Sequence, residues 1–323
     1  GTPVPVLWES HIEEQAVSGL TAAGDVLVAA TQGGQIVALD VGTGAERWRV
    51  HASGAIIGAP VAASSAVYLG VEDSTLYALA LADGRELWRF HAGAPILGAP
   101  AVGADAVYVG SSDGYLYAVS KKDGSELWRF AAGGAIHAAP LLNENALYFG
   151  TIQHELYALD ARNGVELWRF ETVAGIEATP ALQAGLLYAG ADDSRLSCLD
   201  AATGAERWRF SSGDALFAQP LLTEGALYLP SASHVLHALE PATGQEIWRY
   251  EAQSFLTTQP AYDGRRLYLT AVSDPHLYIL DATDGHLLRA VDTGDWPSAP
   301  PLLADGVLYV AQKDGTVLAY ELD

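Results

Sequence analysis

The chain has 323 residues, of which 50% are hydrophobic, and its 39 acidic residues outnumber 17 basic ones to give a formal net charge of −22. A charge of this sign repels phosphate backbones and anionic membrane surfaces, so nucleic acid is not expected as a partner. No apolar run approaches the roughly 18 residues of a membrane-spanning helix, and we expect no membrane span in this chain.

Taken in chain order, the predicted elements are all strands and turns. The first is a strand in VPVLWES (4–10), and the last is a strand in TVLAYELD (316–323). The unit near residue 150 is typical of what lies between them, with strands predicted in ALYFG (146–150), ELYALD (155–160) and VELWRF (165–170). The segment GIEATP (175–180) is expected to begin the first strand of the next unit. No segment shows a capped helical period over ten residues.

Three residue types recur with a period of 40 residues, which is the strongest signal in the sequence. The tryptophans are Trp8, Trp48, Trp88, Trp128, Trp168, Trp208 and Trp248. The tyrosines are Tyr68, Tyr108, Tyr148, Tyr188, Tyr228, Tyr268 and, one residue late, Tyr309. The prolines are Pro60, Pro100, Pro140, Pro180, Pro220, Pro260 and Pro301.

Four short strands in each 40-residue unit predict a β-propeller, and first strands near eight positions predict eight blades. Each blade buries both of its faces only when its neighbours stack on it, so every blade needs the same large interlocking residue. We therefore expect the seven repeated tryptophans to be structural docking residues. The N-terminal strand should complete the last blade and close the ring. Residues 1–323 are expected to form one all-β domain.

The strings LDARNGVELWRF (159–170) and LDAATGAERWRF (199–210) closely resemble the tryptophan-docking repeat of the pyrroloquinoline-quinone (PQQ) propellers. That superfamily includes quinoprotein alcohol dehydrogenases and the BamB-type proteins that assist outer-membrane protein assembly. The resemblance covers the whole chain and implies an eight-bladed propeller. In the dehydrogenases it further implies two adjacent cysteines beneath the cofactor, a bound calcium ion and a catalytic Asp.

Those catalytic features are not expected here. Cys198 is the single cysteine, and no insertion longer than a residue interrupts the repeat to roof a cofactor pocket. The histidines that share a repeat position, such as His11, His51 and His91, fall on adjacent stacked sheets about 10 Å apart. Zinc needs each ligand nitrogen at about 2.0–2.1 Å. We therefore expect no catalytic residue, no cofactor and no metal.

The segments that lead into each first strand offer the best candidate site, because they line the central channel in propellers of this family. They are bland in the first three repeats and polar or aromatic later. The candidates at this channel mouth are His137, Glu177, Phe217, Gln219, Thr257, Gln259 and Trp296. Glu13 and Glu14 could join them from the first blade. Such a set predicts a binding site for a small ligand or a peptide; the alternative is that wet channel positions simply tolerate change.

Two functions remain open at this stage. The first is a non-enzymatic, BamB-like interaction scaffold of the bacterial envelope, which would bind an envelope or outer-membrane assembly protein. The alternative is a ligand-sensing propeller excised from a larger protein, such as a receptor-like bacterial Ser/Thr kinase. The sequence contains no Met, even at position 1, so we expect that a targeting segment was removed or that a domain was cut from a larger chain. Both functional hypotheses imply an extracytoplasmic bacterial location, whether periplasmic, envelope-attached or secreted.

Overall fold

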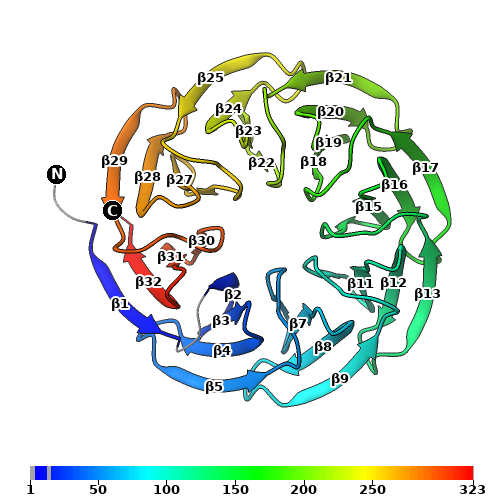
Figure 1. Cartoon of the computed structure of the whole chain (residues 1–323), viewed down its shortest axis with the longest axis horizontal. Helices are drawn as coiled ribbons and strands as arrows, with labels where there is room; N and C mark the ends of the chain where they lie inside the picture. Colours follow the sequence, from blue (N-terminus) through cyan, green and yellow to red (C-terminus); the bar gives the residue numbers. More distant parts are fainter. Residues whose placement is uncertain (1–3, 13–15, 323) are drawn as a thin grey trace.

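The computed structural model describes residues 4–12 and 16–322, and these form 32 strands in eight four-stranded antiparallel sheets. The sheets are the blades of a closed ring, in which the first strands lie nearest the central axis and the fourth strands form the outer rim (Figure 1). The predicted eight-bladed all-β propeller is thereby confirmed. The described residues contain no helix, and thus none with the length and hydropathy of a membrane span.

The blades are numbered here in chain order, each from its innermost strand outward. Blade 1 is β2 (Val17–Ala23), β3 (Val26–Thr31), β4 (Gln35–Asp40) and β5 (Glu46–His51). Blade 2 is β6 (Val61–Ala63), β7 (Ala66–Gly70), β8 (Thr75–Ala80) and β9 (Glu86–His91). Blade 3 is β10 (Ala101–Val102), β11 (Ala106–Gly110), β12 (Tyr115–Ser120) and β13 (Glu126–Ala131). Blade 4 is β14 (Leu141–Asn143), β15 (Ala146–Gly150), β16 (Glu155–Asp160) and β17 (Glu166–Glu171).

The second half of the ring follows the same order. Blade 5 is β18 (Ala181–Gln183), β19 (Leu186–Gly190), β20 (Arg195–Asp200) and β21 (Glu206–Ser211). Blade 6 is β22 (Leu221–Leu222), β23 (Leu227–Pro230), β24 (Val235–Leu239) and β25 (Glu246–Glu251). Blade 7 is β26 (Ala261–Tyr262), β27 (Arg266–Thr270), β28 (His276–Asp281) and β29 (Leu287–Asp292). Blade 8 is β30 (Leu302–Ala304), β31 (Val307–Ala311), β32 (Thr316–Glu321) and β1 (Val6–His11).

Blade 8 closes the ring with strands from both ends of the chain, as predicted. Strand β1 pairs antiparallel with β32, where Trp8 lies opposite Ala319, and the two strands run side by side in Figure 1. One expected boundary is wrong: GIEATP (175–180) precedes β18 instead of beginning it. Pro180, which ends that segment, has no backbone N–H to donate to the ladder, and the paired register of β18 starts at Ala181.

Each repeated tryptophan donates a hydrogen bond from its indole to a backbone carbonyl of the next blade. In blade 4 the indole Nε1 of Trp168 donates a hydrogen bond to the carbonyl of Ala201 in blade 5, at 3.0 Å. The hydroxyl of Tyr148 donates to the same carbonyl at 3.2 Å, and the two rings lie 5.8 to 5.9 Å apart wherever this pair recurs in blades 2 to 5. The equivalent indole bonds run from Trp8, Trp48, Trp88, Trp128, Trp208 and Trp248 to the carbonyls of Val41, Leu81, Lys121, Ala161, Pro241 and Ala282.

The glycine that precedes each tryptophan in the repeat receives the indole of the previous blade. Gly204 has a φ of +72°, and a Cβ built on it would lie 2.7 Å from Cδ2 of Trp168. A side chain is therefore excluded on two grounds, namely the left-handed backbone and the indole that covers it. The core consequently lies between the blades, as in the cluster of Tyr148, Leu156 and Trp168 with residues of blade 5.

Blade 7 is the exception to this docking pattern. Arg289 lies opposite Ile279 in the register position that Trp248 occupies opposite Ala238 in blade 6. The third and fourth strands of blade 8, β32 and β1, come from opposite ends of the chain, and among the described residues no turn between them offers a carbonyl or a glycine to an indole. In keeping with this, the Tyr268 hydroxyl donates to Asp263 within its own blade, at 2.8 Å.

Candidate functional site

The ring has two faces with different loops. Because the strands of each blade are antiparallel, one face carries the connections from each fourth strand to the next first strand, together with the turns between second and third strands. We call it the connection face. The opposite face carries the turns between first and second and between third and fourth strands, and we call it the turn face.

All seven predicted channel-mouth residues lie on the connection face, in the segments that precede the first strands. Phe217 and Trp296 are 43% and 40% exposed, Glu177 is exposed, and the other four are half-buried. No hydrogen bond, ion pair or ring contact joins any two of them within the described part of the chain. The structure thus places them on one face without bringing them into one cluster. Glu13 and Glu14 lie outside the described residues.

Gln219 and Gln259 are engaged between blades. The Nε2 of Gln219 donates to the Pro180 carbonyl at 3.1 Å, and that of Gln259 donates to the Pro220 carbonyl at 3.2 Å. Before blade 2 the neighbouring entry segments approach closely through small residues, since a Cβ on Gly58 would lie 2.5 Å from the backbone nitrogen of Ala99. The two amides therefore join neighbouring blades through one N–H each.

Trp296 carries a cation over its ring. The Nζ of Lys313 lies 5.1 Å from the ring centroid, and the backbone N–H of Lys313 donates to the Trp296 carbonyl at 2.8 Å. The ammonium is attracted by the electron-rich face of the indole. This is an exposed aromatic group held in place by a neighbouring loop.

Beside Glu177 lies a carboxylate with an unsatisfied oxygen. Oδ1 of Asp192 is buried and has no hydrogen-bond partner among the described residues. Burial raises the pKa of Asp192, and the nearby charges of Glu177 and Asp193 raise it further, whereas His154 lowers it. A pKa above that of the unfolded chain means that this carboxyl favours folding while protonated, and that its contribution is lost as the pH rises through the folded-state pKa.

We therefore expect Asp192→Asn to raise the thermal midpoint at pH 7, because the amide removes the charge of a half-buried carboxyl whose Oδ1 has no hydrogen-bond partner among the described residues. The gain should shrink as the pH falls toward the usual carboxyl range of about 4, where Asp192 is itself protonated. Thermal unfolding of both proteins between pH 3 and 8 measures this. An Asn variant that is less stable than the parent at pH 7 would contradict it.

Exposed large apolar side chains lie on two parts of the ring, namely along the outer strands, as at Leu127 and Leu167, and on the connection face. On the connection face, those that sequence reasoning did not select are Ile57, Val173, Phe255 and Val272, which join Phe217 and Trp296. Val173 is the most exposed of them, at 67%. Ile57 belongs to one of the first three repeats, which carry no polar or aromatic residue there. Val173, Phe255 and Val272 lie outside the repeat positions from which the channel-mouth residues were predicted. Exposure of several such residues on one face marks a surface suited to protein contact.

His91 and His11, which share a repeat position, make separate contacts within their own blades. His91 Nδ1 lies 3.1 Å from Oγ1 of Thr75 within its own blade, and His11 contacts Thr316 at 3.3 Å in the same way. Within residues 4–12 and 16–322, no group of three or more His, Cys, Asp or Glu side chains is placed to hold a metal ion. The expectation of no metal and no cofactor stays a prediction.

The sequence and the fold are similar to those of known proteins. The family model described as outer membrane protein assembly factor BamB matches residues 5–209, 154–235 and 231–323. No curated protein matches the chain. The crystal structure of the computationally designed Ika8 protein is similar with a TM-score of 0.87 at 19% identity, covering 98% of this chain and 99% of that one. BamB from Moraxella catarrhalis is similar with a TM-score of 0.81 at 21% identity, covering 98% of each chain.

Proposed function

Because the chain belongs to the family of outer membrane protein assembly factor BamB, we propose that it is a non-enzymatic scaffold that binds a protein partner in the bacterial cell envelope. The partner would be a component of the outer-membrane protein assembly machinery. The proposed location is extracytoplasmic, which is where such machinery works.

Beyond the family, the proposal is supported by exposed aromatic side chains on the connection face. Phe217, Phe255 and Trp296 are exposed large side chains held on a ring whose blades are interlocked by repeated tryptophans. Aromatic residues are enriched at the centres of protein interfaces, because they bury large areas at a small cost in side-chain entropy. A rigid ring loses little further entropy when it binds.

The non-enzymatic part of the proposal is supported by the state of the ionisable groups. Burial raises the pKa of the Cys198 thiol to about 12, which makes it a poor nucleophile at neutral pH. The carboxylates with lowered pKa values are mostly held by arginines of the same blade, as Glu86 is by Arg89. These perturbations are accounted for by packing and by ion pairs on the blade surface.

The test uses the purified ring as bait in the envelope fraction of the host, with chemical cross-linking and mass spectrometry of the captured proteins. We expect recovery of an outer-membrane assembly component, in proportion to the amount of bait. Recovery of no protein above the level of an unrelated acidic propeller would overturn the scaffold assignment. Cell fractionation should place the chain with envelope proteins.

A further inference from the structure

One position on the third strand distinguishes blade 5 from the others. In most blades an arginine follows the docking tryptophan on the fourth strand, and the position in question is the third-strand residue that pairs with it. In blade 4 Tyr157 pairs with Arg169, and in blade 5 Ser197 pairs with Arg209. Around the ring the position is occupied by Val37, Tyr77, Tyr117, Tyr157, Ser197, His237, Tyr278 and Leu318. Most blades therefore place a ring there, and Ser197 is the smallest occupant.

The tyrosines show what this position holds. The Tyr157 ring meets Phe130 of the previous blade edge-on at 5.3 Å between centroids, and the Arg169 guanidinium lies over it at 5.7 Å. In blade 3 the Tyr117 ring lies 5.3 Å from Phe90, and its hydroxyl donates to Oδ2 of Asp113 at 2.7 Å. Both tyrosines thus meet an aromatic ring of the previous blade and donate to a carboxylate, which is Asp113 in blade 3 and Glu155 in blade 4, and Tyr157 also lies beneath an arginine.

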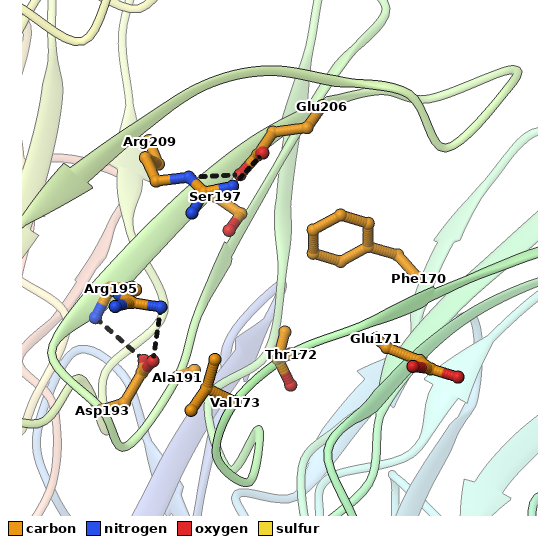
Figure 2. Close-up of a pocket in the computed structure, with 10 residues that line it drawn as sticks. All are labelled: Phe170, Glu171, Thr172, Val173, Ala191, Asp193, Arg195, Ser197, Glu206 and Arg209. Atoms are coloured by element: carbon orange, nitrogen blue, oxygen red, sulfur yellow. Dashed lines mark hydrogen bonds and ion pairs between the residues drawn. The ribbon is translucent and has the colours of Figure 1, made fainter.

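In blade 5 the surrounding residues are present and the ring is missing. Phe170 corresponds to Phe130, Arg209 to Arg169, and Asp193 to Asp113. They line a pocket of about 140 Å³ together with Ser197 and Thr172. Figure 2 shows the Phe170 ring on one side of the gap and Arg209 and Ser197 on the other. A cavity of about 150 Å³ in another protein accommodates benzene, so the space suits one aromatic ring.

The polar groups at the rim are those that a phenol requires. Arg195 Nη1 lies 3.5 Å from Oδ2 of Asp193, which keeps the carboxylate at the pocket, and Arg209 is held by Glu206. A phenol hydroxyl donates a strong hydrogen bond to a carboxylate, and a guanidinium is attracted to the face of the ring. The side chains of Arg195 and Arg209 are 46% and 58% exposed, so this side of the pocket faces solvent.

The pocket also adjoins the connection face. Thr172 and Val173, which line it, begin the connection from blade 4 to blade 5. Val173 is exposed and belongs to the connection face, as Phe217 and Phe255 do. A partner lying on this face would reach the pocket with a side chain and would not need to enter the ring.

We propose that the Ser197 pocket binds a tyrosine side chain of a partner polypeptide, which completes in trans the ring that blades 2, 3, 4 and 7 supply themselves. This assignment rests on the proposed scaffold function for the polypeptide nature of its ligand. The para-hydroxyphenyl group would lie between Phe170 and Arg209 and donate its hydroxyl proton in a hydrogen bond to Asp193.

The test is a titration with N-acetyl-L-tyrosinamide, followed by saturation-transfer NMR and calorimetry. We expect binding to the wild-type chain, at least tenfold weaker binding to Ser197→Tyr, and several-fold weaker binding of N-acetyl-L-phenylalaninamide, which lacks the hydroxyl. Ser197→Tyr restores the residue of four other blades and should keep the thermal midpoint and circular dichroism of the parent. Equal binding by the parent and by a folded Ser197→Tyr variant, or no binding by the parent, would overturn the proposal.

A matched variant creates the same space elsewhere. Tyr117→Ser leaves Phe90, Asp113 and Arg129 around an empty position, and we expect it to add a second site for N-acetyl-L-tyrosinamide, provided that circular dichroism shows it folded. A folded Tyr117→Ser variant that binds no more N-acetyl-L-tyrosinamide per chain than the parent would contradict the inference that the missing ring creates the site. Binding of p-cresol without binding of N-acetyl-L-tyrosinamide would overturn the polypeptide ligand.

Failure of this proposal can be told from failure of the scaffold function. If Ser197→Tyr captures the envelope partner as well as the parent does, the pocket is not its anchor and the scaffold stands. If the parent binds N-acetyl-L-tyrosinamide yet captures no envelope protein, the pocket binds tyrosine rings and the scaffold assignment fails.

Discussion

Replacing Trp168 with alanine is expected to lower the free energy of unfolding by about 3–5 kcal/mol, the range measured for buried aromatic residues truncated to alanine. The side chain is 9% exposed and packs between two blades, where it covers Gly204 and contacts Tyr148. The Ala201 carbonyl would keep its bond from the Tyr148 hydroxyl, so the loss comes mainly from the cavity. Urea unfolding followed by circular dichroism measures the change.

Trp296→Ala is the matched control for this experiment. Trp296 is the tryptophan that lies off the 40-residue grid, and its ring is 40% exposed and contacts Lys313. Surface substitutions usually change stability by no more than about 0.5 kcal/mol. A Trp168→Ala variant that loses no more than Trp296→Ala would contradict the docking role of the repeated tryptophans.

Gly204→Ala should also destabilise the ring strongly, for two separable reasons. Its φ of +72° imposes a left-handed backbone, which costs a residue with a Cβ about 1–2 kcal/mol. The new methyl would also lie 2.7 Å from Cδ2 of Trp168, and overpacking of this kind costs about 1–3 kcal/mol more. The expected loss is the sum of the two, measured by the same urea unfolding.

Gly185→Ala separates these two contributions. Gly185 lies in the same blade with a φ of +78°, and a Cβ built on it meets nothing within 4 Å. It should therefore show the backbone cost alone. If the two alanine variants lose the same stability, the indole of Trp168 does not press on the turn as described.

Most of the fold could be predicted from the sequence because the repeat makes every local signal appear many times. The strands predicted at 146–150 and 155–160 coincide with β15 and β16, and the closure by β1 followed from counting third and fourth strands. The tryptophan period also stops at Trp248 in the sequence, which shows that the next repeat lacks the docking residue but not which residue takes its place. Only the register, with Arg289 opposite Ile279, shows which residue replaces it.

The candidate site was less predictable, because residue type does not say where a side chain points. Gln219 and Gln259 looked like groups available to a ligand, whereas their amides join neighbouring blades. The signal for the Ser197 pocket was present in RLSCLD (195–200), where serine replaces a repeated tyrosine. Recognising it as a pocket required the positions of Phe170 and Arg209, which come from different blades.

If the connection face binds an envelope partner, charges placed on this face should abolish capture, whereas the same number of charges on the outer strands should not. The triple variant Ile57→Asp, Phe217→Asp and Phe255→Asp places charges on that face, and Leu127→Asp, Leu167→Asp and Ile247→Asp places as many on exposed positions of the outer strands. Both are compared with the parent in the cross-linking capture, after circular dichroism confirms that they are folded. We expect the connection-face variant to lose the captured partner and the outer-strand variant to retain it. Capture that survives the connection-face substitutions and is lost with those on the outer strands would contradict this expectation.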